Sequence, residues 1–143
     1  MSDITKLSLS ELVKNIKDKK LSCEEVTKAF IDRSEKSKEL NTYITEDYSS
    51  ALEKSKKFDQ KPNLDLKLPG IPIAVKDLFC TKDIRTTAGS KILDNFIPSY
   101  ESTVTQNIWN EGAILLGKLN CDEFAMGSSN ETSFFWKCSK SNR

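Results

Sequence analysis

The feature that most constrains this chain is residues 68–79 (LPGIPIAVKDLF), its longest nearly uninterrupted apolar run. Two prolines, a glycine and several β-branched residues favour a core strand over a helix. Side chains alternate across a strand, so Lys76 lies where the strand ends, on the face opposite Val75. A lysine there must be paired, neutral or functional. The simplest alternative is that Lys76 reaches solvent and pairs with Asp77.

Composition narrows the class of protein. The 143 residues are enough for one ordinary domain, and a net charge of +1 gives no electrostatic case for direct binding to nucleic acid or a membrane. No apolar run approaches the roughly 20 residues that span a bilayer. Residues 1–12 lack the apolar segment of a secretory signal and the arginine of a mitochondrial presequence. We therefore expect a cytoplasmic protein without membrane contact.

The chain contains no histidine. This excludes a Ser-His-Asp triad, a Cys-His dyad and an ordinary zinc site with histidine ligands within these residues. The four cysteines are widely spaced and form no C-x-x-C, so free thiols are expected rather than disulfides or a metal site. Acid–base chemistry would have to use Lys, Asp, Glu, Tyr or Cys, and a Ser-Lys pair is the most familiar nucleophile and base that remains.

Residues 1–60 read as a helical region. Possible capping boxes at residues 8–11 and 22–25 begin helices that end near residues 18 and 40. Residues 41–45 favour a short strand, and Asp47 is placed to cap a third helix that runs to about residue 58. A polar loop at residues 59–67 leads into the apolar run.

The second half of the chain reads as strand, helix, strand. A helical stretch after residue 102 should end at Gly112, and residues 113–119 form a second candidate core strand. This order predicts an α/β unit with a right-handed parallel crossover. Residues 120–130 read as a short helical turn that opens into a Gly-Ser loop.

Two sequence blocks resemble the amidase signature family. Residues 68–77 (LPGIPIAVKD) resemble its lysine-bearing strand, and residues 117–129 (GKLNCDEFAMGSS) resemble its second N-terminal block. The resemblance spans about residues 5–135 and is specific in these two blocks. It implies an α/β fold with a mixed β-sheet covered by helices on both faces. Residues 61–135 would be the start of that core, following the helical region of residues 1–60, and the fold would be incomplete.

The resemblance also implies the chemistry. The family uses a Ser-cisSer-Lys triad, and Lys76 matches the lysine that acts as base through a bridging serine. This role requires a lowered lysine pKa, from desolvation or nearby positive charge. The loop of Met126, Gly127, Ser128 and Ser129 is expected to line the site that holds the substrate amide. Without the family, Ser128 or Ser129 could instead be the nucleophile that Lys76 activates. No metal or cofactor is expected in this chain.

Residues 122–133 (DEFAMGSSNETS), with residues 86–90 and 100–104, resemble the branch of the family found in tRNA-dependent amidotransferases. In that branch the substrate is glutamine, and the released ammonia passes to a partner subunit. The partner uses ATP and Mg to amidate Glu-tRNA(Gln), or in some organisms Asp-tRNA(Asn). Subunits B and C would be the partners, and tRNA would be contacted only indirectly. Alternatives are another amidase-signature hydrolase with a different amide substrate, or a non-catalytic module that binds the partner subunits.

The resemblance ends near residue 136. The family's two catalytic serines lie further along a longer chain, whereas residues 136–143 (WKCSKSNR) contain three basic residues and no acid. We expect a non-family tail on a truncated or frameshifted chain that neither hydrolyses glutamine nor folds by itself. The alternative is a genuine short protein with a solvated basic tail.

Overall fold

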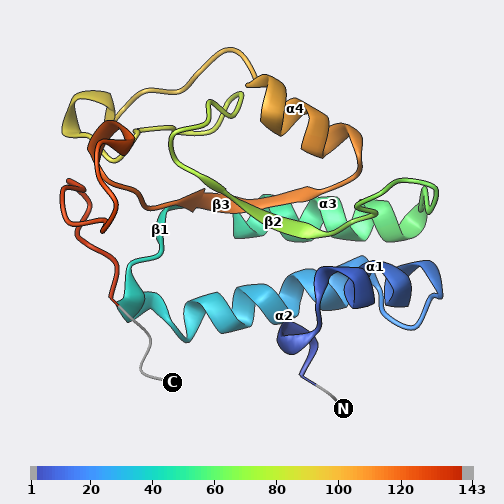
Figure 1. Ribbon diagram of the computed structural model, residues 1–143. Coiled ribbons are helices and arrows are strands. Elements are labelled where there is room, and N and C mark those ends of the chain that lie inside the picture. The colour runs from blue at the N-terminus through green and yellow to red at the C-terminus, as the bar shows by residue number, and fades with distance from the viewer. Residues whose placement is uncertain (1–2, 140–143) are drawn as a thin grey trace. The chain divides into compact units, whose positions relative to one another are not determined.

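The computed structural model describes residues 3–139, and Figure 1 labels the main elements. Residues 140–143 of the predicted tail lie outside this range. The α-helices are α1 (Leu9–Lys17), α2 (Cys23–Glu35), α3 (Tyr48–Gln60) and α4 (Thr103–Asn110). The strands are β1 (Tyr43–Glu46), β2 (Pro72–Lys76) and β3 (Ile114–Leu119). Short 3-10 turns at Ile4–Lys6, Lys38–Leu40, Lys91–Leu93 and Glu123–Ala125 complete the regular structure of the described residues.

The chain divides into two compact units that interleave along the sequence. The first contains the residues up to Lys36, Asp47–Ile73 and Asn107–Leu116, and the second contains Ser37–Glu46, Ala74–Gln106 and the residues from Gly117 onward. The predicted boundary between residues 60 and 61, and the tail from residue 136, stay predictions.

The N-termini of the first two helices are fixed by the capping boxes that the sequence predicts. In α1, Ser8 accepts a hydrogen bond from the Glu11 N–H and the Glu11 carboxylate accepts one from the Ser8 N–H. Ser22 and Glu25 repeat this arrangement at α2. Each box satisfies donors that would otherwise lack a partner in the first helical turn.

Two local predictions need correction. Helix α2 ends at Glu35 rather than near residue 40, because residues 36–39 supply no apolar side chain to extend its buried stripe. A separate 3-10 turn (Lys38–Leu40) follows, and Asn41 after it adopts the left-handed conformation. Asp47 does precede α3, but its side chain makes no capping hydrogen bond. Its backbone (φ −123°, ψ 37°) is outside the extended conformation that aims a capping side chain at the helix.

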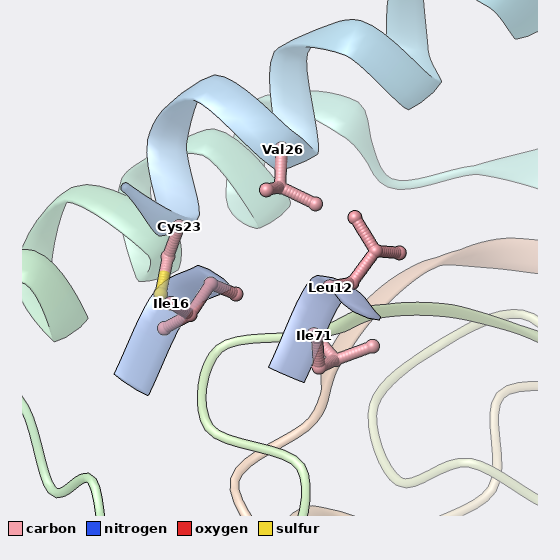
Figure 2. Packing of buried hydrophobic residues seen from close by; sticks show 5 residues of the cluster. All are labelled: Leu12, Ile16, Cys23, Val26 and Ile71. Atoms are coloured by element: carbon pink, nitrogen blue, oxygen red, sulfur yellow. The ribbon is translucent and has the colours of Figure 1, made fainter. Parts of the chain in front are cut away.

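The first unit has a hydrophobic core formed by α1, α2 and the residue before β2. Figure 2 shows its buried members: Leu12, Ile16, Cys23, Val26 and Ile71. Gly70 makes this packing possible, because a Cβ there would lie 2.0 Å from Cys23 Sγ, and its φ of 65° suits glycine. The apolar run therefore enters the core through a position that accepts no side chain.

Strands β2 and β3 run parallel. Ile114 N donates to Ile71 O at 2.8 Å, and Asp77 N donates to Leu119 O at 2.9 Å, so the bonds advance in the same direction along both strands. Strand β3 lies in the middle of the sheet, in the order β1-β3-β2. This confirms the predicted strand, helix, strand order with a parallel pair; the hand of the crossover stays a prediction.

Strand β1 pairs with β3 in the antiparallel sense, which makes the sheet mixed. Tyr43 lies opposite Leu119 and Glu46 opposite Gly117, with an irregularity between Tyr43 and Thr45. A Cβ at Gly117 would lie 2.4 Å from Thr45 O, so the close approach of β1 requires glycine at this point. The α/β class with a mixed sheet is therefore confirmed.

Candidate functional site

Lys76 is the last residue of β2, as the sequence predicts, and its side chain is exposed. Its Nζ has no hydrogen bond or ion pair within residues 3–139, whereas its neighbours Val75 and Asp77 are buried. Of the simple alternative, the exposure of Lys76 to solvent is confirmed, and the pair with Asp77 is wrong because Asp77 pairs with a different lysine. The strand therefore presents the Lys76 amine without a partner from the part of the chain that is described.

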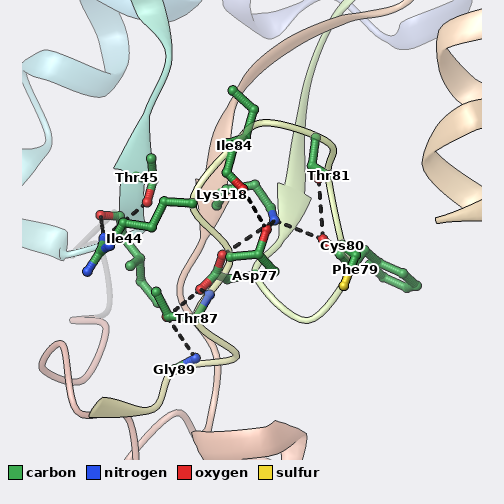
Figure 3. Close-up of polar contacts among 12 residues, drawn as sticks. Ile44, Thr45, Asp77, Phe79, Cys80, Thr81, Ile84, Thr87, Gly89 and Lys118 are labelled. Carbon is green, nitrogen blue, oxygen red and sulfur yellow. Dashed lines mark hydrogen bonds and ion pairs between the residues drawn. The ribbon is translucent and has the colours of Figure 1, made fainter. Parts of the chain in front are cut away.

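That other lysine is Lys118, on β3, and it is fully buried. Figure 3 shows its polar contacts. Its Nζ donates to Phe79 O at 2.8 Å and to Thr86 Oγ1 at 2.7 Å, and lies 3.4 Å from Asp77 Oδ1. The contacts with Phe79 and Thr86 are hydrogen bonds, whereas the contact with Asp77 Oδ1 is an ion pair in which that oxygen accepts no hydrogen bond from the described residues. Burial lowers the pKa of Lys118, and Asp77 opposes that shift.

Asp77 connects this lysine to the loop that follows β2. Its Oδ2 accepts hydrogen bonds from the Thr87 N–H at 2.8 Å and the Thr87 hydroxyl at 2.5 Å. Its backbone carbonyl accepts from Ala88 N at 3.0 Å. The residue after Lys76 is thus held by its side chain and its backbone, which fixes the end of the strand that carries Lys76.

Sequence reasoning did not identify the pair of Lys118 and Asp77. The only available signal was that Lys118 is the single charged residue within the apolar stretch 113–119. A charge at such a position has to be compensated inside the protein. Finding its partner requires the parallel pairing of β2 and β3, which the sequence does not specify residue by residue.

The loop of Met126, Gly127, Ser128 and Ser129 is exposed, and it is organised by Asp122. Asp122 Oδ2 accepts from the backbone N–H groups of Ser129 and Asn130, at 3.2 and 2.9 Å. Its Oδ1 accepts from the Thr132 N–H at 3.1 Å and the Thr132 hydroxyl at 2.9 Å. The hydrogen bonds from Asn130 and then Thr132 lower the pKa of Asp122.

The thiol of Cys121, which precedes Asp122 in the chain, is buried. Burial, followed by the negative charge of Asp77, raises the pKa of Cys121, and Asp122 adds to this rise. The positive charges of Lys76 and Lys118 lower the same pKa. The charges of Lys76 and Asp122 thus act on the pKa of Cys121 in opposite directions. The structure does not join Lys76 to a serine. Neither Ser128 nor Ser129 forms a hydrogen bond with Lys76 among the described residues.

All four cysteines are free thiols, as predicted. Across residues 3–139, no group of three or more His, Cys, Asp or Glu side chains is arranged to hold a metal ion. No helix in that range has the length and apolar character required to cross a membrane.

The comparisons with known proteins define the class. The Amidase family profile matches residues 25–140, most of the chain, so the chain belongs to the amidase family. The match includes Lys76, Asp77, Lys118 and the loop around Asp122. The family predicted from the sequence is confirmed.

Among curated relatives, the chain is 85% identical over 135 residues to the A subunit of glutamyl-tRNA(Gln) amidotransferase from Pelagibacter ubique (strain HTCC1062). It is 52% identical over 137 residues to the A subunit of the same enzyme from Rickettsia bellii (strain OSU 85-389). Each alignment covers 94% of this chain, and the chain spans about 28% of the length of these relatives.

Solved structures of related proteins share this fold. The A subunit of glutamyl-tRNA(Gln) amidotransferase from Thermotoga maritima superposes with a TM-score of 0.70 at 28% identity, over 95% of this chain and 27% of that one. A fatty acid amide hydrolase gives a TM-score of 0.84 at 24% identity, over 96% of this chain and 26% of that one, which supports the fold alone.

Proposed function

We propose that these residues are the lysine-bearing part of the A subunit of a glutamyl-tRNA(Gln) amidotransferase. In this proposal the A subunit hydrolyses glutamine and supplies ammonia for the formation of Gln-tRNA(Gln). The observation that carries the proposal is the 85% identity to an A subunit of that name over 94% of the chain. The match of the family profile to the strand that bears Lys76 supports it further.

In the proposed mechanism Lys76 is the base of a Ser-cisSer-Lys triad. Its position at the exposed end of β2, with no partner for its Nζ in the described residues, leaves the amine available to a bridging serine. A lysine accepts a proton only in its neutral form, which a site closed off from water favours. Lys76 is exposed within residues 3–139. In this proposal, the rest of the complete active site shields the Lys76 amine from water.

The proposal assigns the loop of residues 126–129 to the substrate amide. Met126, Gly127, Ser128 and Ser129 are exposed, and Asp122 holds the far end of the loop through its carboxylate. Such a loop can hold glutamine against the triad while the base acts on the nucleophile.

The partners and cofactors follow from the same assignment. Subunits B and C would be the protein partners, and ATP and Mg would be used by the partner subunit rather than by this chain. The tRNA would reach this chain only indirectly, in the cytoplasm. The names of the curated relatives support the assignment, because each is a subunit of an amidotransferase that is named for Glu-tRNA(Gln).

The test is a chimera in which the 135 aligned residues of this chain replace the matching segment of the Pelagibacter A subunit. Purified with its partner subunits, the chimera is expected to release ammonia from glutamine. Lys76→Met should abolish that release, and Lys82→Met, which removes an exposed lysine in the same unit, should leave it unchanged. A folded chimera without activity, or one that is active with Met at position 76, would contradict the proposal.

A second candidate function is the hydrolysis of an amide other than glutamine. It is supported by the fold that the chain shares with a bacterial aryl acylamidase, at a TM-score of 0.73 and 26% identity. The same chimera, offered an aryl amide and glutamine in parallel, separates the two. A non-catalytic role in binding the partner subunits predicts that the chimera with Lys76→Met still co-purifies with them and that no variant at position 76 alters turnover.

A further inference from the structure

Asp122 closes the Gly-Ser loop at both ends. Its backbone carbonyl accepts a hydrogen bond from Ala125 N at 2.8 Å, at the start of the loop. Its carboxylate accepts from Ser129, Asn130 and Thr132 at the far end. The segment between these ends is therefore attached to a single residue.

The carboxylate has no acceptor capacity left. Each of its oxygens accepts two hydrogen bonds, and a carboxylate oxygen has about two lone-pair sites. Asp122 is also only 6% exposed, whereas Met126 in the loop above it is 80% exposed. Asp122 therefore faces the inside of the loop, and the loop presents its outer side to solvent.

Gly127 shows how closely the loop follows the carboxylate. A Cβ at Gly127 would lie 2.5 Å from Asp122 Cγ, so the backbone passes directly over the carboxylate. The contact leaves no room for a side chain at that position. The shape of residues 126–129 is thus determined from below by Asp122.

We propose that Asp122 is a positioning residue that shapes the loop of residues 126–129 for the substrate amide. This inference rests on the proposed function, since it uses that loop as the substrate site. Asp122 does not touch the substrate. It acts through the backbone of Ser129, Asn130 and Thr132, and so it controls substrate binding more than the proton transfers at Lys76.

Asp122→Asn separates this role from simple packing, because the side chain keeps its size. One oxygen becomes an amide NH₂ group, which sets a donor against backbone N–H donors and removes the charge that strengthens all four bonds. In the active chimera, the KM for glutamine should rise by about tenfold or more, with kcat changed by less than about threefold. Glu131→Gln is the matched control, because Glu131 is exposed just after the loop and, among residues 3–139, accepts only from the Ser129 hydroxyl.

Thr132→Val provides a second reading in case the Asn variant does not fold. It removes the hydroxyl that donates to Asp122 and accepts from the Glu123 N–H, but it keeps the Asp122 carboxylate and its three backbone donors, so a smaller rise in KM is expected. An unchanged KM in both folded variants, or a loss of kcat at constant KM, would overturn the inference.

Hydrogen exchange gives a reading that does not depend on turnover. The amides of Ser129, Asn130 and Thr132 should be protected in the unmodified chimera and should lose protection in Asp122→Asn. Absence of protection in the unmodified chimera would overturn the positioning role. Protection without glutamine hydrolysis would uphold the role of Asp122 in shaping the loop and refute the proposed function.

Discussion

Lys118 Nζ lies 3.4 Å from Asp77 Oδ1, and neither side chain is accessible to solvent. The pair joins β3 to the residue that follows Lys76. Lys118 also donates to Phe79 O and Thr86 Oγ1, so one buried ammonium group holds three segments together. The exposed end of β2 is thus supported by a buried charge network directly behind it.

Removing one member of this pair should strongly lower the stability of the protein. Lys118→Met leaves the Asp77 carboxylate buried without its cation, and breaking a buried pair in this way typically costs about 3–5 kcal/mol. We expect a loss of that order in the free energy of unfolding of the chimera, measured by urea denaturation. The matched control is Lys67→Met, which breaks the exposed pair with Glu111 and should have far less effect.

A double-mutant cycle tests whether the two charges act together. Lys118→Met combined with Asp77→Asn removes both charges, so the double variant should be destabilised by less than the sum of the single variants. A coupling of roughly 0.5–3 kcal/mol is typical for residues in one network. Additive effects would show that Lys118 and Asp77 stabilise the protein independently.

The sequence was sufficient to predict elements whose signals are local. The capping boxes at Ser8 and Ser22, and the strand that ends at Lys76, depend on residues within one turn or one strand. The end of α2 was predicted too late, because no proline or glycine marks it and the polar residues 36–39 are compatible with a helix.

The buried parts of the site could not be predicted in the same way. The partner of Asp77 is Lys118, which is distant in sequence, and the role of Asp122 depends on a loop that folds back over its carboxylate. Each contact arises from tertiary pairing and has no fixed spacing in the sequence. The family resemblance marked Lys76 and the loop of residues 126–129 as candidates, but it gave no indication of the residues that hold them in place.

The thiol of Cys23 should be inert in the folded protein. Burial, with an added contribution from the Asp59 carboxylate, raises its pKa to about 12, and its side chain is inaccessible. At pH 8.5, iodoacetamide should label the partly exposed Cys80 well before Cys23, as read by peptide mass spectrometry. Rapid labelling of Cys23 under native conditions would mean that α2 does not pack on the core as described.

The capping box of α2 should contribute measurably to stability. Ser22→Ala removes the acceptor for the Glu25 N–H at the start of a helix that packs Val26 into the core. Loss of a serine cap typically costs about 1 kcal/mol. Ser10→Ala, at an exposed position inside α1, removes the same hydroxyl without a cap and should be nearly neutral. Equal melting temperatures for Ser22→Ala and Ser10→Ala would contradict the capping role.

The contribution of Asp122 should depend on pH in a defined direction. Its folded-state pKa lies below the ordinary value of 3.8, because hydrogen bonds from Asn130 and Thr132 favour the carboxylate. A lowered folded pKa means that unfolding takes up protons, so the stabilisation is fully present above pH 3.8 and is lost as the pH falls through the folded pKa. The difference in melting temperature between the chimera and Asp122→Asn should therefore be constant near neutral pH and shrink below pH 3.8. Glu131→Gln makes a matched comparison just after the same loop, and a difference for Asp122→Asn that grows on acidification would contradict the assigned hydrogen bonds.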